Sequence, residues 1–67
     1  MKIGDQVKVV SGAPDNGTEG TIVGFGTGAY SHHIYVAVTK YIWRGDDITG
    51  ATHPRRFIAY EERLAAL

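Results

Sequence analysis

Three histidines and two adjacent aspartates are the side chains of this sequence that could bind a metal ion. His32 and His33 are sequence neighbours. On a strand, neighbouring side chains point to opposite faces, so these two cannot chelate one ion together. A zinc site would need His53 to join one of them with a carboxylate from Asp46 or Asp47. We therefore interpret the histidines as surface residues and predict no metal site.

The sequence contains no arrangement of residues that is typical of a catalytic site. Ser11 and Ser31 lie outside any nucleophile-elbow sequence. Asp46 and Asp47 are neighbours, which is unsuited to a pair of cooperating carboxylates. The glycine-rich residues 24–28 could cradle a phosphate only if a helix followed them, and a strand pattern follows instead. We predict no catalytic residues, and a flexible hairpin loop at these glycines.

Aromatic and cationic side chains favour a different chemistry, which is binding. The 67 residues include one Trp and four Tyr. Aromatic rings interleaved with cations can stack on bases and pair with phosphates, and the same residue types anchor protein interfaces. The alternative is that some of these rings cap the open ends of a small barrel. The predicted binding surface consists of Tyr35, Tyr41, Trp43, Arg44, Arg55 and Arg56.

Charge and composition limit the partners and the compartment. Seven Lys and Arg balance seven Asp and Glu, whereas strong non-specific binding to nucleic acid needs an excess of cations. Residues 30–60 nevertheless carry a local charge of +2. The chain has no Cys, no apolar run of the roughly 20 residues that span a bilayer, and no signal-peptide core at its start. We expect a cytoplasmic protein that does not contact a membrane.

Composition predicts one small all-β domain over residues 1–67. Nine Gly, six Val, six Ile and six Thr stand against two Leu, a balance that suits strands and turns. A single core of this size leaves a stability margin of only a few kcal/mol. Because neither a disulfide nor a zinc cluster is available, we expect additional support from barrel closure or self-association.

Alternation of apolar and polar residues predicts the first three strands. The first covers residues 6–10 and is followed by turn-formers at 12–17. The second covers residues 20–25, with Ile22 inward. The third, residues 33–39, has the clearest pattern and could continue to residue 43; it places on one face Ile34, Val36 and Val38.

The second half of the chain predicts two more strands. Residues 44–54 are polar and contain Gly, which indicates an irregular excursion or a short edge hairpin. Residues 55–60 predict a fourth strand, then 61–64 a single helical turn, then 65–67 a last strand that closes the sheet. In the fourth strand, Phe57 and Ala59 share one face, and the other face carries Arg56, Ile58 and Tyr60.

Five short strands, a Gly-Asp-x-Val start and a turn before the last strand together resemble an SH3-like barrel. Gly4-Asp5-Gln6-Val7-Lys8-Val9, followed by residues 17–23, is similar to the KOW motif of ribosomal and transcription-elongation proteins. This resemblance implies a small five-stranded barrel that docks onto nucleic acid or a nucleoprotein assembly.

A second resemblance, to the type II dihydrofolate reductases, covers more of the chain. It includes Gly4-Asp5-x-Val7, Ser11-Gly12-Ala13, Ile22-Val23-Gly24-Phe25 and His53-Pro54 ahead of Tyr60. These reductases are SH3-like barrels that form homotetramers around a shared pore, which implies NADPH as cofactor and a pore face at Ile58 and Tyr60.

This sequence departs from the reductase pattern where the family binds its ligands. The pore motif Val-Gln-Ile-Tyr corresponds to Phe57-Ile58-Ala59-Tyr60, so an apolar residue replaces the amide that would contact folate and nicotinamide. Val9 stands where the family has the Lys that attracts the anionic ligand tails. We therefore expect no hydride transfer, while Ile58 and Tyr60 could still form an apolar patch between subunits.

Three functional hypotheses remain open. The first is a non-catalytic module that binds nucleic acid or a nucleoprotein and needs no cofactor. The second is a reductase-like homo-oligomer, dimer or tetramer, that holds an anionic small molecule in a shared pore. The third, suggested by the size alone, is an accessory protein of a phage or mobile element that binds a host protein.

Overall fold

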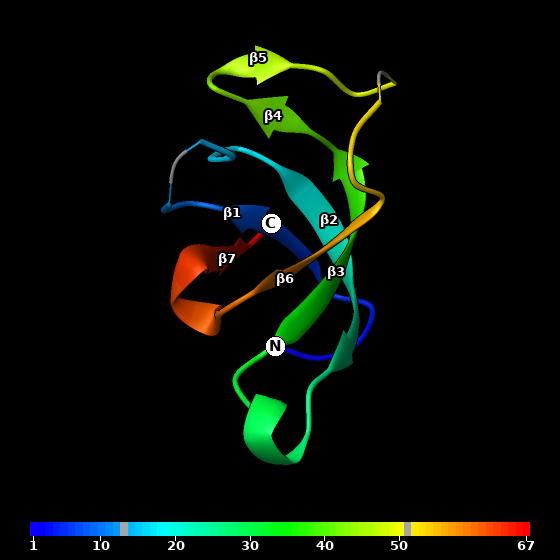
Figure 1. Cartoon of the computed structure of the whole chain (residues 1–67), viewed down its shortest axis with the longest axis vertical. Coiled ribbons are helices and arrows are strands. Elements are labelled where there is room, and N and C mark those ends of the chain that lie inside the picture. The colour runs from blue at the N-terminus through cyan, green and yellow to red at the C-terminus, as the bar shows by residue number, and fades with distance from the viewer. Residues whose placement is uncertain (13, 51) are drawn as a thin grey trace.

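The computed structural model describes residues 1–12, 14–50 and 52–67, and these residues form an all-β domain with two single turns of 3-10 helix (Figure 1). The predicted fold class is thus confirmed at the level of all-β. The elements, in chain order, are β1 Gln6–Val9, β2 Glu19–Phe25, η1 Gly28–Tyr30, β3 Ile34–Lys40, β4 Ile42–Trp43, β5 Asp46–Asp47, β6 Arg56–Ala59, η2 Glu61–Arg63 and β7 Leu64–Ala66.

Five of the strands form one antiparallel sheet in the order β6-β3-β2-β1-β7, and β4 pairs with β5 in a separate ribbon. The described residues therefore form seven strands, where five were predicted. β6 and β7 are the two edges of the main sheet, and no ladder joins them in the part of the chain that is described. The predicted closure of the sheet is thus not observed among the described residues.

The core lies on the concave side of the main sheet. Its buried side chains come from five different strands, and half-buried Phe57 packs against them. The predicted inward positions of Ile22, Ile34 and Val36 are confirmed, and Ala59 is also buried. Val38 is only half-buried, because its cross-strand partner Gly20 has no side chain to cover it. The buried cluster consists of Val7, Val9, Ile22, Ile34, Val36, Ala59 and Leu64.

Two irregularities in the β2–β3 ladder determine which side chains reach the convex face. The register shifts between Glu19 and Gly20 and again between Ile22 and Gly24. Val23 is the extra residue of the second shift, and it is 41% exposed. At the first shift, a Cβ atom on Gly20 would collide with the carbonyl oxygen of Ala37. Only Gly therefore lets the strands approach so closely there.

The β4–β5 ribbon confirms one of the two predictions for residues 44–54, a short edge hairpin. Its loop consists of Arg44 and Gly45, with φ of 50° and 87°, and positive φ at both loop residues is typical of a type I′ turn. β4 is a separate strand and does not continue β3, since Tyr41 interrupts the ladder between them.

A buried hydroxyl attaches this hairpin to the main sheet. Thr18 is fully buried, and its Oγ1 accepts a hydrogen bond from the Ile42 N–H and donates one to the Ile42 carbonyl, both at 3.1 Å. The Arg44 N–H adds a bond to the Pro14 carbonyl at 2.8 Å. These contacts hold β4 against the loop between β1 and β2.

Arg63 holds the other end of the same loop. The guanidinium donates to the backbone carbonyls of Ser11 and Gly12, at 3.1 and 3.3 Å, and forms an ion pair with Asp15 at 2.8 Å. The helical turn predicted for residues 61–64 is η2, and β7 begins one residue earlier than the predicted last strand. η2 is therefore bound to the loop between β1 and β2, in addition to following β6 in the chain.

We expect Thr18→Val to lower the free energy of unfolding by about 1–3 kcal/mol, because it leaves the Ile42 N–H and carbonyl without their partner while keeping the side-chain volume. Urea denaturation followed by circular dichroism measures this. Thr39→Val is the matched control, since Thr39 is exposed and its change should stay within about 0.5 kcal/mol. Equal losses in both variants would contradict the role of the Thr18 hydroxyl.

Candidate binding surface

Three aromatic rings form a stack where β3 gives way to the hairpin. The Tyr41 ring lies nearly parallel to Trp43, with centroids 6.3 Å apart and planes 13° apart. The Tyr41 and His53 rings have centroids 5.3 Å apart and planes 9° apart. Tyr41 is buried, at 8% exposed, whereas Trp43 is 41% exposed. Tyr41 therefore supports the stack from within, and Trp43 presents it to solvent.

The turn places a cation beside the exposed indole. The Arg44 guanidinium carbon lies 5.9 Å from the centroid of the Trp43 ring, within the range of a cation–π contact. Arg44 is the only residue other than glycine with positive φ among the described residues, and Asn, Asp and Gly are the residues that tolerate this conformation. The turn thus carries a residue that is unfavourable for the backbone but suitable for binding an anion.

Thr49 and Asp47 fix the base of the stack. The Thr49 hydroxyl accepts a hydrogen bond from the Tyr41 N–H at 2.8 Å, and the Thr49 N–H donates to Asp47 Oδ1 at 2.9 Å. The hydrogen bond from the Thr49 hydroxyl, followed by that from its N–H, lowers the pKa of Asp47 below its usual value. Thr49 therefore links Asp47 of β5 to the backbone of Tyr41, the residue directly before β4.

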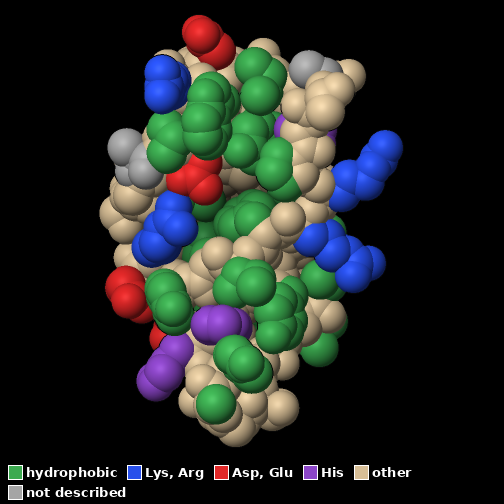
Figure 2. All heavy atoms as spheres, in the orientation of Figure 1, with side chains coloured by type: hydrophobic (Ala, Val, Ile, Leu, Met, Phe, Trp, Pro, Cys, Tyr) green, Lys and Arg blue, Asp and Glu red, His purple; other side chains and the backbone are tan. Residues whose placement is uncertain are grey.

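A hollow of about 520 Å³ adjoins the stack and is lined by Gly50, Thr52, His53 and Arg55. Its lining is mainly polar, and Arg55 is exposed. His53 belongs both to this hollow and to the stack, so the hollow that Arg55 lines adjoins the stack through His53. The turn of the hairpin and the segment that leads into β6 lie on opposite sides of the molecule (Figure 1). Figure 2 shows cationic side chains extending into solvent from the side of the molecule.

The other two predicted binding residues lie on the convex face, where β3 and β6 pair. Tyr35 is opposite Ile58, and Arg56 is opposite Ala37. A shallow groove of about 400 Å³ runs between Tyr35, Arg56, Ile58 and Val23, and also touches Gly24 and Phe57. The six predicted residues therefore form two groups: Tyr41, Trp43, Arg44 and Arg55 near the hairpin, and Tyr35 and Arg56 on the sheet.

His33 lies among three tyrosines, a cluster that the sequence analysis did not foresee. Its ring centroid is 5.3 Å from Tyr30, 6.4 Å from Tyr35 and 5.6 Å from Tyr60, the last two in edge-to-face geometry. Figure 2 shows hydrophobic side chains gathered around a histidine on this face. Only the strand alternation of residues 33 and 35 hinted at it, because Tyr60 comes from a distant segment.

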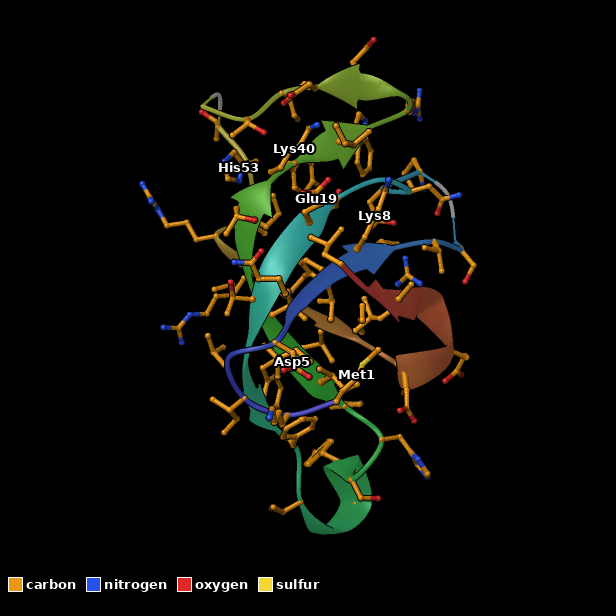
Figure 3. All side chains as sticks on the ribbon, turned by 180° about the vertical axis from the view of Figure 1, so that it is seen from behind. Met1, Asp5, Lys8, Glu19, Lys40 and His53 are labelled. Atoms are coloured by element: carbon orange, nitrogen blue, oxygen red, sulfur yellow. The ribbon has the colours of Figure 1, made fainter. Side chains whose placement is uncertain are left out.

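The histidines lie apart. His33 precedes β3 in the tyrosine cluster, whereas His53 stacks on Tyr41 beyond the other end of that strand (Figure 3). Within residues 1–12, 14–50 and 52–67, no three His, Cys, Asp or Glu side chains lie close enough to hold a metal ion.

No helix of this described part is long and apolar enough to span a bilayer.

The convex face next to the hairpin carries charges of both signs. Lys8 pairs across the sheet with Glu19, and Glu19 with Lys40, so the three form a row across β1, β2 and β3 (Figure 3). The central carboxylate offsets one of the two ammonium groups and so weakens the attraction of this row for an anion. Arg44 of the hairpin and Arg55 and Arg56 are exposed and lie outside this row.

Comparison with protein-family models, with curated proteins and with solved structures finds no match to this chain. The geometry described above is therefore what the functional argument rests on.

We expect Thr49→Ala to raise the pKa of Asp47 toward its usual value, because it removes the hydroxyl that stabilises the carboxylate. A lowered pKa stabilises the fold at pH values above the unfolded pKa, and this contribution is lost as pH falls through the folded pKa. The wild type should therefore hold the hairpin to lower pH than the variant. Titration of the Asp47 carboxyl by NMR measures the shift. Thr52→Ala should leave it unchanged, and an equal shift in both variants would contradict the assignment.

Proposed function

We propose that this chain is a non-catalytic binding module and that its ligand is single-stranded nucleic acid, held at the hairpin end. Trp43 would stack on a base, Arg44 would pair with a phosphate next to that base, and Arg55 would meet the strand farther along, beyond His53. The single observation that carries the proposal is the backbone of Arg44: a cationic side chain occupies a positive-φ turn position and lies over an exposed indole.

The conformation of Arg44 supports a functional role because it runs against the preference of the backbone. A residue other than glycine in the left-handed region costs of order 1–2 kcal/mol. The cation–π contact with an exposed ring offsets roughly 0.5–1 kcal/mol of this. The part of this cost that the contact does not offset argues that the guanidinium is placed there for an external anion. Phosphate, like carboxylate, accepts two parallel hydrogen bonds from a guanidinium group.

The aromatic stack supports base stacking in particular. Single-strand binding proteins combine a cationic track with exposed rings, and each stacked base contributes about 1–3 kcal/mol. Here the exposed indole is backed by buried Tyr41 and then by His53, so the ring is already held in place before a ligand arrives. A fixed ring loses little side-chain entropy on binding.

The charges at the hairpin end balance one another. Between residues 40 and 56, Lys40, Arg44, Arg55 and Arg56 stand against Asp46 and Asp47, but Lys40 pairs across the sheet with Glu19, and Arg56 lies on the sheet. Arg44 and Arg55 are therefore matched by two carboxylates, and because the whole chain is also neutral, binding should be weak and sensitive to salt.

The proposal includes an SH3-like barrel with a KOW-like start. Two features support it: the last strand, β7, pairs with the first, and a 3-10 turn separates β6 from β7. The reductase-like hypothesis stays a prediction, tested by dihydrofolate-dependent oxidation of NADPH. Absence of nucleic-acid binding would instead favour a protein partner, such as a host protein bound by an accessory factor.

A labelled oligothymidine of about 12 nucleotides, a length within the range that small β-barrels bind, provides the test. The wild type should raise its fluorescence anisotropy and quench Trp43 emission, with an affinity that falls as salt rises. Arg44→Asn should weaken binding and lower the slope of log K against log salt by about one phosphate contact. Its fold should be retained, since Asn tolerates positive φ.

Lys2→Asn is the matched control, because it also removes one cation but lies near the N-terminus, away from the hairpin (Figure 1). It should leave the affinity and the salt slope unchanged. A wild type without quenching or salt dependence would refute nucleic-acid binding, and equal effects of the two variants would refute the hairpin as the site.

A further inference from the structure

The edge of β6 presents backbone hydrogen-bonding groups to solvent. The Val38 N–H donates to the Arg55 carbonyl at 2.9 Å, and β6 pairs with β3 as Val36 with Phe57 and Tyr35 with Ile58. In an antiparallel ladder, hydrogen-bonded and non-hydrogen-bonded pairs alternate. The backbone groups of residues 55, 57 and 59 are therefore directed to β3, and those of residues 56 and 58 point away from the sheet.

This edge lacks most of the features that keep edge strands apart. Proteins protect such strands with a bulge, a covering segment, an inward charge, or proline or lysine within the strand. β6 contains neither proline nor lysine, and its ladder with β3 has no register shift. Its central outward residue, Ile58, is 53% exposed, and the following Tyr60 is 45% exposed. No described segment pairs with its outer side.

We propose that β6 pairs with β6 of a second copy of this chain, antiparallel and centred on Ile58, to form a two-fold dimer. The two Ile58 residues would exchange N–H···O=C bonds across the axis. Such an isologous contact closes on itself and joins the two sheets into one. This interface shares Arg55 with the proposed nucleic-acid surface but includes neither Trp43 nor Arg44, and it does not depend on the proposed nucleic-acid binding.

The side chains are complementary in this register. Residues directly opposite one another share a face of the sheet, so Arg56 meets Tyr60 of the other copy, which fits a cation–π contact. The ladder ends there, because Glu61 begins η2. At this end the side chain of Arg55 would meet Glu61 of the other copy, and both residues are exposed. By symmetry each contact occurs twice, around the central pair of isoleucines.

Charge disfavours the neighbouring registers that keep the outward groups paired. The register centred on Ala59 places Arg56 opposite Glu62 of the other copy, but it also places Arg55 opposite Arg63. The register centred on Arg56 places this arginine opposite its own equivalent. The register centred on Phe57 places Arg55 and Arg56 opposite Ala59 and Ile58, with no anion or ring to meet. Only the Ile58-centred register gives both a favourable partner, so charge selects it.

Sedimentation velocity across a concentration series tests the dimer. Arg55→Glu and Glu61→Arg should each raise the dissociation constant roughly two- to thirtyfold, since two exposed ion pairs are lost. The double variant, which restores opposite charges in reversed order, should recover dimerisation. Recovery in the double variant distinguishes a direct contact from a general effect of either substitution.

Ile58→Lys tests the centre of the interface and should give a monomer, because it places two ammonium groups against each other. Val10→Lys is its matched control, since Val10 has the same exposed fraction, 53%, and lies outside β6; it should remain dimeric. Circular dichroism of both variants should match the wild type, because both side chains are exposed.

A wild type that sediments as a monomer at every concentration would overturn the proposal. So would an oligomer that neither Ile58→Lys nor the charge reversals weaken, since it would use another surface. Arg44→Asn should leave the dissociation constant of the dimer unchanged, so the dimer and the nucleic-acid proposal can fail independently.

Discussion

The hydrogen bonds of the Thr18 hydroxyl hold the β4–β5 hairpin, and with it the proposed binding surface, in place. The β4–β5 hairpin has strands of only two residues and no ladder with the main sheet, and an isolated hairpin of that size is not stable in water. It is ordered because a fully buried hydroxyl bonds both backbone groups of Ile42, and because Tyr41 is packed beneath Trp43. The positions of Trp43 and Arg44 therefore depend on a residue that lies 24 positions before the strand it holds.

The main sheet could be predicted from the sequence, and the reason is its alternation. In residues 34–38 the pattern of Ile, Val and Val on one face follows directly from a period of two, and burial of Ile34 and Val36 agrees with it. Phe57 and Ala59 follow the same rule. The register shifts between β2 and β3 could not be predicted. The first, for example, lies where Gly20 approaches Ala37 across the sheet, a contact that no local pattern encodes.

The candidate site was predictable as a set of residue types but not as an arrangement. Trp43 and Arg44 stand out in the sequence. The indole, however, stacks on Tyr41, and Tyr41 stacks on His53, which lies ten residues after Trp43, so this arrangement forms only when the hairpin folds. The split between Tyr41, which is buried, and Trp43, which is exposed, also follows only from the break between β3 and β4. Composition predicts binding chemistry, and tertiary packing decides which rings are exposed to solvent.

The proposed interface and the proposed binding surface are related to two properties of this small neutral chain: its unpaired sheet edges and its small number of cations. A sheet with two unpaired edges buries little surface for its length, and pairing through β6 would remove one edge from each copy. A neutral chain also neutralises few phosphates, so one hairpin should bind weakly. In the two-fold dimer both hairpins stay clear of the axis residue Ile58, and a single strand that reaches both would bind the second at high effective concentration. Dimerisation would thus raise affinity without requiring any further cation in the sequence.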